Sequence, residues 1–323
     1  MVSKITIKNF KSIKELSFNA KRINLFIGKP NTGKSNILEA LGVFSLSYRA
    51  NIKELIRLEK IADLFWNKET SLKIEVYASN FKWETYQQGG DIYIKADFIE
   101  KGSANLFDYR FDNNANFAGS VSHIFFTKDN PFKFYRFKTL PYFPYQEHSF
   151  LLPPNGENLL AILNTNQEIY NFVKLILDEF KLQLVLEEGE AKIKILKLEP
   201  KTILFPYLLL SDTLQRIIFH FVAIKSNRDS IILFEEPEAH SFPYYTKILA
   251  ETIAFDKKNN QYFISTHNPY FLSSLIEKTP KEELTIFYVY IKEHQTMLKE
   301  LSDKEKEDIS TGKIDPFFQF SED

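Results

Sequence analysis

The chain has 323 residues, a formal net charge of −1, 44% hydrophobic and 26% charged residues, and no cysteine. This length exceeds the limit of about 250–300 residues for one hydrophobic core, so we expect one large two-lobed domain or two domains. The sequence has no apolar run that could span a membrane, no apolar signal core and no cysteine for a disulfide, which makes the cytoplasm the expected compartment. The near-neutral charge means that any DNA contact would need a local basic patch.

Residues 1–50 are predicted to join strands to a glycine-rich loop and a helix. Residues 4–10 alternate in polarity as a strand does, and a second strand follows them. Residues 22–27 are typical of a short buried strand, and residues 36–41 begin an amphipathic helix. Between them, residues 28–35 spell G-x-x-x-x-G-K-S. A strand, a glycine loop and a helix are the context in which this string forms a phosphate-binding P-loop.

The P-loop predicts a site for a nucleoside triphosphate. Its glycines let the backbone wrap around an anion, and the helix start adds unpaired N–H groups and partial positive charge. Lys34 is expected to reach the β- and γ-phosphates, and the Ser35 hydroxyl is expected to bind Mg²⁺. The residues expected to contact the nucleotide are Gly28, Lys29, Pro30, Asn31, Thr32, Gly33, Lys34, Ser35 and Asn36.

Residues 51–200 are expected to form a β-rich lobe followed by a helical insertion. The predicted strands are residues 72–77, 91–96, 107–111 and 123–126. The sequence Gln87-Gln88-Gly89-Gly90 supplies a hairpin turn. A Pro-Pro-Asn-Gly stretch at 153–156 closes this region, and helical sequence follows from 157 to about 181.

Residues 201–323 place acidic residues at the end of a buried strand. From about 182 to 276, strands and helices alternate as a parallel sheet requires. The apolar run 230–234 predicts a strand buried on both faces, and Glu235-Glu236-Pro237-Glu238 follows it. Glu235 is expected to hold Mg²⁺, and Glu236 to orient and deprotonate the attacking water. Three acids in four residues also suit a solvated turn, but a bound cation offsets their repulsion.

A further predicted strand, residues 261–265, ends in Thr266-His267-Asn268-Pro269. A histidine at the same sheet edge as the P-loop can reach the γ-phosphate and respond to its presence. His267 is therefore expected to be a catalytic residue, together with Lys34 and Glu236. The remaining histidines that we considered are expected to be structural, and they are His123, His148, His220 and His294.

Four ordered motifs resemble those of an ABC-type ATPase head of the RecF/SMC/OLD group. Residues 5–14 resemble the opening strand of that group, and residues 33–41 resemble its P-loop helix. Residues 235–240 resemble the Walker B and D-loop of OLD-like ATPases, and residues 265–269 resemble their switch-histidine strand. The resemblance implies an α/β P-loop NTPase fold, in which a mixed sheet with helices is joined by an antiparallel β-lobe and a helical lobe. It also implies that residues 1–323 form a single two-lobed domain.

The resemblance further implies a homodimer, or a higher oligomer built from dimers, in which each P-loop faces a signature motif of the other protomer. The candidate signature is residues 210–216, where Ser211 caps a helix at 214–223 and directs it at the γ-phosphate in trans. Thr213 stands where the family usually has glycine, a departure that weighs against fast hydrolysis. Glu235 stands where many relatives have aspartate. Gln146 is a candidate Q-loop glutamine, although an ordinary loop glutamine fits that position better.

Two features that the sequence lacks distinguish between the subfamilies of this group, the SMC proteins and the OLD nucleases. No heptad run separates the P-loop from the signature, as the coiled coil of an SMC protein would require. The 56 residues after His267 (323 − 267) are too few for the Toprim domain of OLD nucleases. The resemblance therefore implies an OLD-like head that closes on ATP and gates a separate nuclease or toxin, in prokaryotic antiphage defence or DNA repair. A slowly hydrolysing scaffold that sequesters an effector and a head that binds DNA directly remain alternatives.

Overall fold

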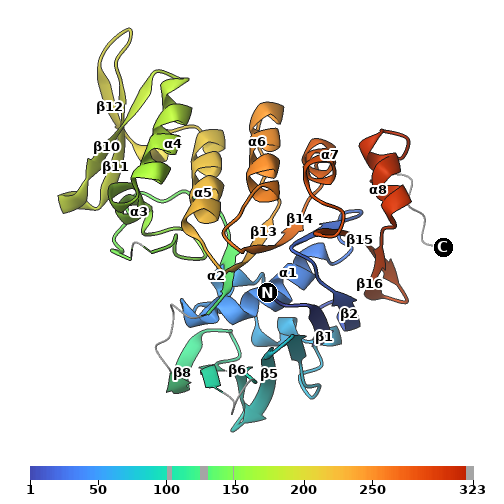
Figure 1. Ribbon diagram of the computed structural model, residues 1–323. Coiled ribbons are helices and arrows are strands. Elements are labelled where there is room, and N and C mark those ends of the chain that lie inside the picture. Colours follow the sequence, from blue (N-terminus) through green and yellow to red (C-terminus); the bar gives the residue numbers. More distant parts are fainter. Residues whose placement is uncertain (100–103, 124–129, 148, 318–323) are drawn as a thin grey trace.

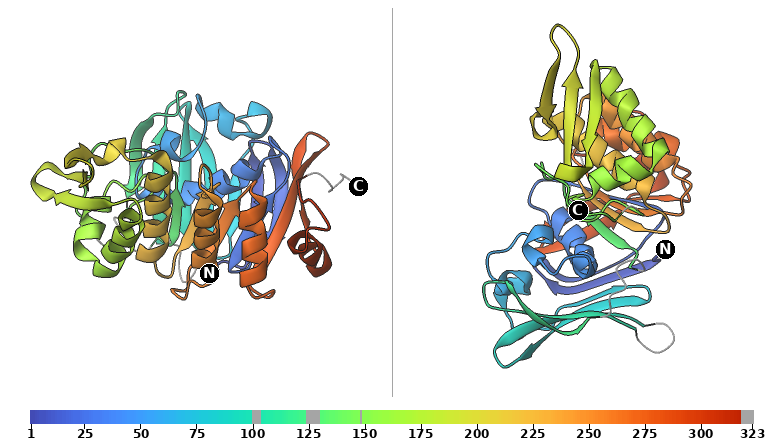
Figure 2. Two further views of the ribbon diagram at one scale, coloured as in Figure 1. Left: turned by 90° about the horizontal axis from the view of Figure 1, so that it is seen from above. Right: turned by 90° about the vertical axis from the view of Figure 1, so that its left-hand side faces the viewer.

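The computed structural model describes residues 1–99, 104–123, 130–147 and 149–317 (Figure 1). A six-stranded sheet forms the central layer, with a row of helices on one face and an antiparallel sheet beyond the other (Figure 2). Its strands are β3 (Ile23–Ile27), β9 (Phe132–Tyr135), β13 (Ile231–Glu235), β14 (Gln261–Ser265), β15 (Leu284–Lys292) and β16 (Gln295–Glu300). Their order is β16-β15-β3-β14-β13-β9, and all neighbours are parallel except the β15–β16 pair.

The central strands are mostly apolar because they are buried on both faces. In β13, Ile232 and Phe234 pack into the core beneath the row of helices. Ile231 and Leu233 point the other way, into the core shared with the antiparallel sheet. This double burial explains the continuous apolar run that predicted the strand, and it confirms the α/β fold with a buried parallel sheet.

The P-loop helix α1 (Lys34–Gly42) lies between the two sheets. The outer sheet has the order β2-β1-β4-β5-β6-β7-β8, and all its pairs are antiparallel. Its strands are β1 (Lys4–Phe10), β2 (Ile13–Asn19), β4 (Glu75–Ala78), β5 (Phe81–Gln88), β6 (Asp91–Phe98), β7 (Ala104–Phe111) and β8 (Phe117–His123). The indole Nε1 of Trp83 donates to the Ala40 carbonyl at 2.8 Å and ties this sheet to α1.

The predicted hairpin turn at 87–90 joins β5 to β6, in the register Gln88↔Asp91. Strand β5 was not predicted. The predicted strand at 123–126 begins at the last residue of β8, and its other residues lie outside the described ranges, as does His148. Short helical segments link α1 to the outer sheet; they are η1 (Val43–Ser47), α2 (Ile52–Leu55), η2 (Ile61–Leu64) and η3 (Trp66–Lys68).

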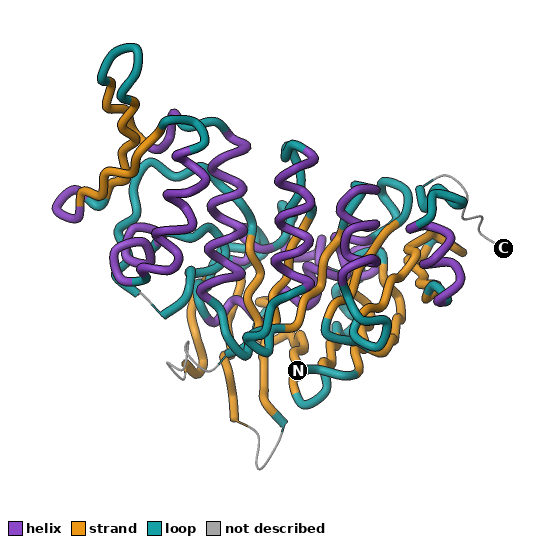
Figure 3. The backbone as a smooth tube through the Cα atoms, turned by 45° about the horizontal axis from the view of Figure 1, so that its top comes forward, coloured by secondary structure: helices purple, strands orange, loops and turns teal. Residues whose placement is uncertain are grey.

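Two predictions for the helical lobe were wrong in detail. The helix predicted at 157–181 is two helices, α3 (Leu159–Thr165) and α4 (Gln167–Asp178), because Asn166 caps α4 by accepting from the Ile169 N–H at 3.0 Å. The parallel alternation does not begin at 182. Residues from 182 to 206 form a separate antiparallel sheet that projects beyond the helices (Figure 3). That sheet contains β10 (Leu182–Glu187), η4 (Glu188–Glu190), β11 (Lys192–Lys197) and β12 (Ile203–Pro206).

The remaining helices cover the central sheet in chain order (Figure 1). After η5 (Tyr207–Leu209) they are α5 (Asp212–Ser226), α6 (Pro243–Ala254), α7 (Pro269–Lys278) and α8 (Asp303–Ser310). Helix α5 runs back along β13, since only four residues join the two elements, 227–230. Its N-terminus therefore lies at the edge of the sheet where β13 and β14 end. Within the described ranges, every helix is too short or too polar to cross a membrane.

Candidate nucleotide-binding site

The glycines of the P-loop occupy positions that no other residue fits. Gly28 and Gly33 have φ values of 137° and 99°, a region that favours glycine. A Cβ atom on Gly28 would lie 2.3 Å from the Val289 carbonyl oxygen, and one on Gly33 would lie 2.1 Å from Thr296 Oγ1. Strands β15 and β16 therefore lie close against the loop. A compact glycine loop of this kind can present backbone N–H groups to a phosphate.

Lys34 folds back over this loop and is nearly buried. Its Nζ donates to the carbonyls of Gly28 at 2.8 Å and Lys29 at 2.6 Å, and Thr32 Oγ1 donates to the Lys29 carbonyl at 2.9 Å. Burial lowers the pKa of the Lys34 ammonium to about 8, and the negative charge of Glu236 opposes that shift. The side chain thus holds its positive charge at the centre of the loop.

Ser35 and Glu235 meet although they are 200 residues apart in sequence, and the Ser35 hydroxyl donates to Glu235 Oε1. Parallel register places Glu235 opposite Ser265 at the end of β13, beside the P-loop. A hydroxyl and a carboxylate are the oxygen ligands that Mg²⁺ prefers. The described residues contain no cluster of three His, Cys, Asp or Glu side chains that could hold a metal alone. This donor set therefore fits a Mg²⁺ ion whose other ligands are phosphate and water oxygens.

Glu236 and His267 face each other across the ends of two neighbouring strands. Their closest atoms, His267 Nε2 and Glu236 Oε1, are 3.5 Å apart. Glu236 has a φ of 46°, an uncommon conformation for this residue type that turns its side chain out of the β13 direction. Its backbone N–H donates to the Ser265 carbonyl at 3.0 Å. Burial first, and then the Lys34 charge, lower the pKa of His267, so the imidazole is neutral at neutral pH.

These side chains surround one cavity of about 430 Å³. Its lining includes most of the predicted nucleotide contacts, namely Pro30, Asn31, Thr32, Gly33, Lys34, Ser35 and Asn36. It also includes Glu235, Glu236 and His267, together with Lys11, Ser12, Arg57 and Ser265. Gly28 and Lys29 contribute the carbonyls that bind Lys34. The polar cavity combines a cationic loop, two oxygen ligands and a carboxylate beside a histidine.

Residues 1–212 match the family model described as the AAA ATPase domain. The chain belongs to the AAA ATPase domain family. The uncharacterized protein MJECL10 of Methanocaldococcus jannaschii is 28% identical to it over 195 residues, which cover 54% of this chain and 89% of that protein. This family membership makes the protein an ATP-binding protein with an ATPase domain.

Solved structures of SMC heads share the fold of this ATPase. The crystal structure of an SmcHead bound to the C-winged helix domain of ScpA has a TM-score of 0.56 and 16% identity, over 94% of this chain and 99% of that chain. An Smc head with an extended coiled coil, bound to the C-terminal domain of ScpA derived from Pyrococcus furiosus, has a TM-score of 0.53 and 14% identity, over 96% and 98%. The expected likeness to the RecF/SMC group is confirmed.

Two further residues predicted from the sequence, Ser211 and Gln146, lie outside the cavity of this ATPase. Ser211 caps α5, where its Oγ accepts from the Leu214 N–H at 3.4 Å, and Thr213 Oγ1 donates to the His240 carbonyl at 2.8 Å. Ser211 is thus at the same sheet edge as Glu236 but does not line the cavity of its own chain. Gln146 does not line the cavity either.

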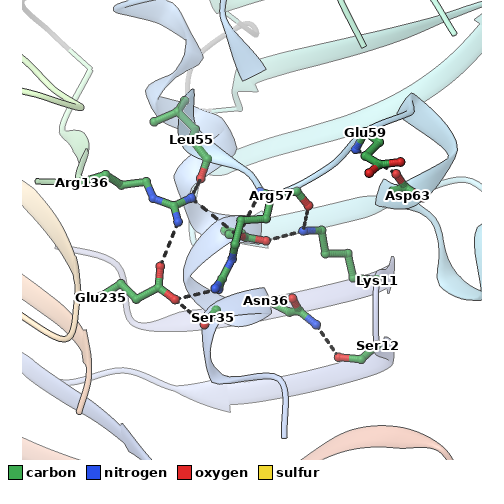
Figure 4. A network of polar contacts seen from close by, with 11 residues as sticks. Lys11, Ser12, Ser35, Asn36, Leu55, Arg57, Glu59, Asp63, Arg136 and Glu235 are labelled. Carbon is green, nitrogen blue, oxygen red and sulfur yellow. Dashed lines mark hydrogen bonds and ion pairs between the residues drawn. The ribbon is translucent and has the colours of Figure 1, made fainter. Parts of the chain in front are cut away.

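Sequence reasoning missed several charged residues of the site (Figure 4). Arg57 Nη2 donates to Glu235 Oε1 at 2.7 Å, and Arg136 Nη2 donates to Glu235 Oε2 at 3.2 Å. Both guanidinium groups also lie near Glu39, which is fully buried on α1. The sequence shows a glutamate, Glu39, within the apolar stretch 37–41, and a buried carboxylate requires cationic partners, but this pattern does not identify them.

Proposed function

We propose that this protein is a Mg²⁺-dependent ATPase that converts ATP and water to ADP and phosphate. The contact between Ser35 and Glu235 carries this proposal, because it joins the P-loop to the paired glutamates at one cavity. The proposed site residues are those expected from the sequence. Lys34 and the loop N–H groups bind the phosphates, and Ser35 and Glu235 hold the metal. Mg²⁺, when bound, offsets negative charge on the β- and γ-phosphate oxygens.

Glu236 is the proposed general base. A water oxygen forms a bond to the γ-phosphorus, the bond from that phosphorus to the bridging β–γ oxygen breaks, and Glu236 takes the proton of the water. Its side chain is accessible to water, and neutral His267 lies 3.5 Å from it. His267 orients the carboxylate and responds to the γ-phosphate. Lys34 neutralises charge on the phosphates during the transfer.

We further assign the protein an ATP-dependent homodimer that gates a partner effector, such as a nuclease or toxin, in prokaryotic antiphage defence or DNA repair. Exposed apolar side chains next to Ser211 support the dimer; they are Leu208, Leu209, Phe242 and Tyr244. The SMC head structure that contains a bound ScpA domain supports a partner-binding role by analogy. OLD-like ATPase heads provide the analogy for the biological setting.

A slowly hydrolysing scaffold is the second candidate. Thr213 places a side chain in the first turn of α5, at the position where relatives have glycine. Its hydroxyl donates a hydrogen bond to the His240 carbonyl, which holds this side chain in place. A side chain there holds the N–H groups of the helix away from a γ-phosphate. Such a protein would bind ATP tightly, stay closed and sequester its effector.

Single-turnover hydrolysis of ATP tests the proposal. We expect Glu236→Gln to bind ATP like the wild type and to hydrolyse it at least about 100-fold more slowly, because it lacks the base. Glu190→Gln, a change on the projecting sheet, is the matched control and should hydrolyse at the wild-type rate. Equal rates for wild type and Glu236→Gln would refute the assigned base. Tight binding with negligible turnover by the wild type would favour the scaffold.

A further inference from the structure

Arg136 lies at the edge of the central sheet, beside Glu235, the proposed metal ligand. It follows β9, the parallel neighbour of β13, and the register Tyr135↔Phe234 makes Arg136 and Glu235 leave their strands side by side. Its Nη2 donates to Glu235 Oε2 at 3.2 Å, and its Nη1 donates to the Leu55 carbonyl at 2.6 Å. Its backbone N–H donates to the Pro154 carbonyl at 2.8 Å. The guanidinium is therefore fixed by both its backbone and its side chain.

The surroundings of Arg136 carry an excess of positive charge (Figure 4). Glu39 accepts from Lys11 Nζ at 2.5 Å and from Arg57 Nε at 3.1 Å, and it lies 3.7 Å from Arg136 Nη1. Three cations thus share two carboxylates, Glu39 and Glu235. Both oxygens of Glu235 already accept hydrogen bonds from cationic groups. A divalent cation that approaches Glu235 meets like charge and must replace these bonds.

A triphosphate changes this balance because its negative oxygens neutralise the added charge of the metal. We propose that Arg136 is a positioning residue that keeps Glu235 from binding a divalent cation until a triphosphate arrives with it. Metal and nucleotide binding are then coupled, and each strengthens the other by the same factor. This inference rests on the proposed function, since it concerns the order in which the same site fills.

Arg136 is better placed for this role than Arg57. The side chain of Arg136 is 22% exposed and that of Arg57 is 59% exposed. Solvent therefore screens the pair formed by Arg57 more strongly. The Arg136 guanidinium also lies 5.6 Å from the ring centroid of Phe134, which limits its movement. Removal of Arg136 should consequently change the affinity of Glu235 for metal more than removal of Arg57.

Binding of Mn²⁺ to the full chain, measured by electron paramagnetic resonance without nucleotide, tests the proposal. We expect Arg136→Gln to bind Mn²⁺ about tenfold more tightly than the wild type, because a charge-assisted hydrogen bond to Glu235 is lost. Arg136→Lys keeps the charge and should stay near the wild type. Arg49→Gln is the matched control, since Arg49 pairs with Glu157 outside the site and is similarly buried. With a non-hydrolysable ATP analogue present, the difference between wild type and Arg136→Gln should shrink.

Equal Mn²⁺ affinities for wild type and a folded Arg136→Gln would overturn the proposal, even if both bind the ATP analogue. Failure of the wild type to bind the analogue would instead refute the proposed function. If circular dichroism shows that Arg136→Gln is unfolded, Arg136→Met replaces it, because its side chain still covers Phe134. Mn²⁺ affinity like that of the wild type in Arg136→Met would likewise overturn the proposal.

Discussion

Glu238 follows Glu235 and Glu236 in the loop after β13, and its side chain is almost fully buried. Thr266 donates to its Oε1, while Oε2 has no hydrogen-bond partner among the described residues. The backbone N–H of Asn268 donates to Thr266 Oγ1 at 3.0 Å. Glu238 and Thr266 therefore connect the loop after β13 to the loop that carries His267. Burial is the main reason that the pKa of Glu238 is raised from 4.5 to about 7.

This pKa predicts that stability falls as the pH rises. Between the unfolded value of 4.5 and the folded value of about 7, only the folded protein holds the proton on Glu238. The stabilisation is complete below the lower value and is lost as the pH rises through the upper one. Relative to Glu238→Gln, we expect the wild type to lose about 3 kcal/mol of unfolding free energy over this window. Urea denaturation at several pH values measures this loss, and parallel curves for the two proteins would contradict the prediction.

Among the elements, α5 is the one that links the predicted signature to the loop after the glutamates. Its N-cap residue is Ser211, and the Thr213 hydroxyl donates to the His240 carbonyl across that loop. The predicted start of the helix at 214 lies two residues too late, because the cap at Ser211 lets the helix begin at Asp212. The predicted signature is thereby in direct contact with the loop that follows Glu236.

Thr213→Val tests the hydrogen bond between Thr213 and His240 with little change in side-chain shape. The valine side chain keeps the volume of threonine but leaves the His240 carbonyl without its donor. We expect the unfolding free energy to fall by about 1 kcal/mol, while Thr213→Ser, which keeps the hydroxyl, stays within about 0.5 kcal/mol of the wild type. Urea denaturation at fixed pH measures both. Equal losses in the two variants would show that the hydroxyl is unimportant.

The sequence predicts the elements whose local pattern is strong. The P-loop with its flanking strand and helix, β13 and β14 all combine a doubly buried apolar run with a motif at its end. Strand β9 was missed because Lys133 interrupts its apolar residues. In the structure that lysine is buried, donates to Ser230 Oγ at 2.8 Å and lies 3.9 Å from the ring centroid of Phe150.

The polar network of the site was out of reach for a related reason. Arg57 and Arg136 pair with Glu235 across 178 and 99 residues, and no local pattern specifies such partners. Residues 182–206 were wrongly assigned to the parallel sheet for a different reason. Strand β11 alternates in polarity and buries one face only, and β10 and β12 are short apolar strands, a pattern that suits an antiparallel sheet as well as the edge of a parallel one.

At the scale of the whole molecule, the cavity and the start of α5 share one edge of the central sheet. Phe242 and Tyr244 lie beside Ser211 and line a depression with it. The side chain of Phe242 is 69% exposed and that of Tyr244 is 54% exposed, so the two form an exposed apolar patch. An apolar surface next to the proposed trans contact is what a dimer that closes over ATP would bury.

Phe242→Glu should therefore prevent dimerisation without unfolding the protein. Phe242 is the N-cap residue of α6, where a negative charge is favourable to the helix, so the fold should persist. In the Glu236→Gln background with ATP, multi-angle light scattering should detect a dimer, and Phe242→Glu should weaken it at least tenfold, because an unpaired carboxylate would be buried at the interface. Val121→Glu adds the same charge to an exposed apolar position of the outer sheet and should leave the dimer intact. Both variants keep the P-loop. If Phe242→Glu is monomeric but still binds ATP, the substitution has removed the interface and left the nucleotide site intact. A dimer equally stable in both variants would mean that the protomers meet through another face.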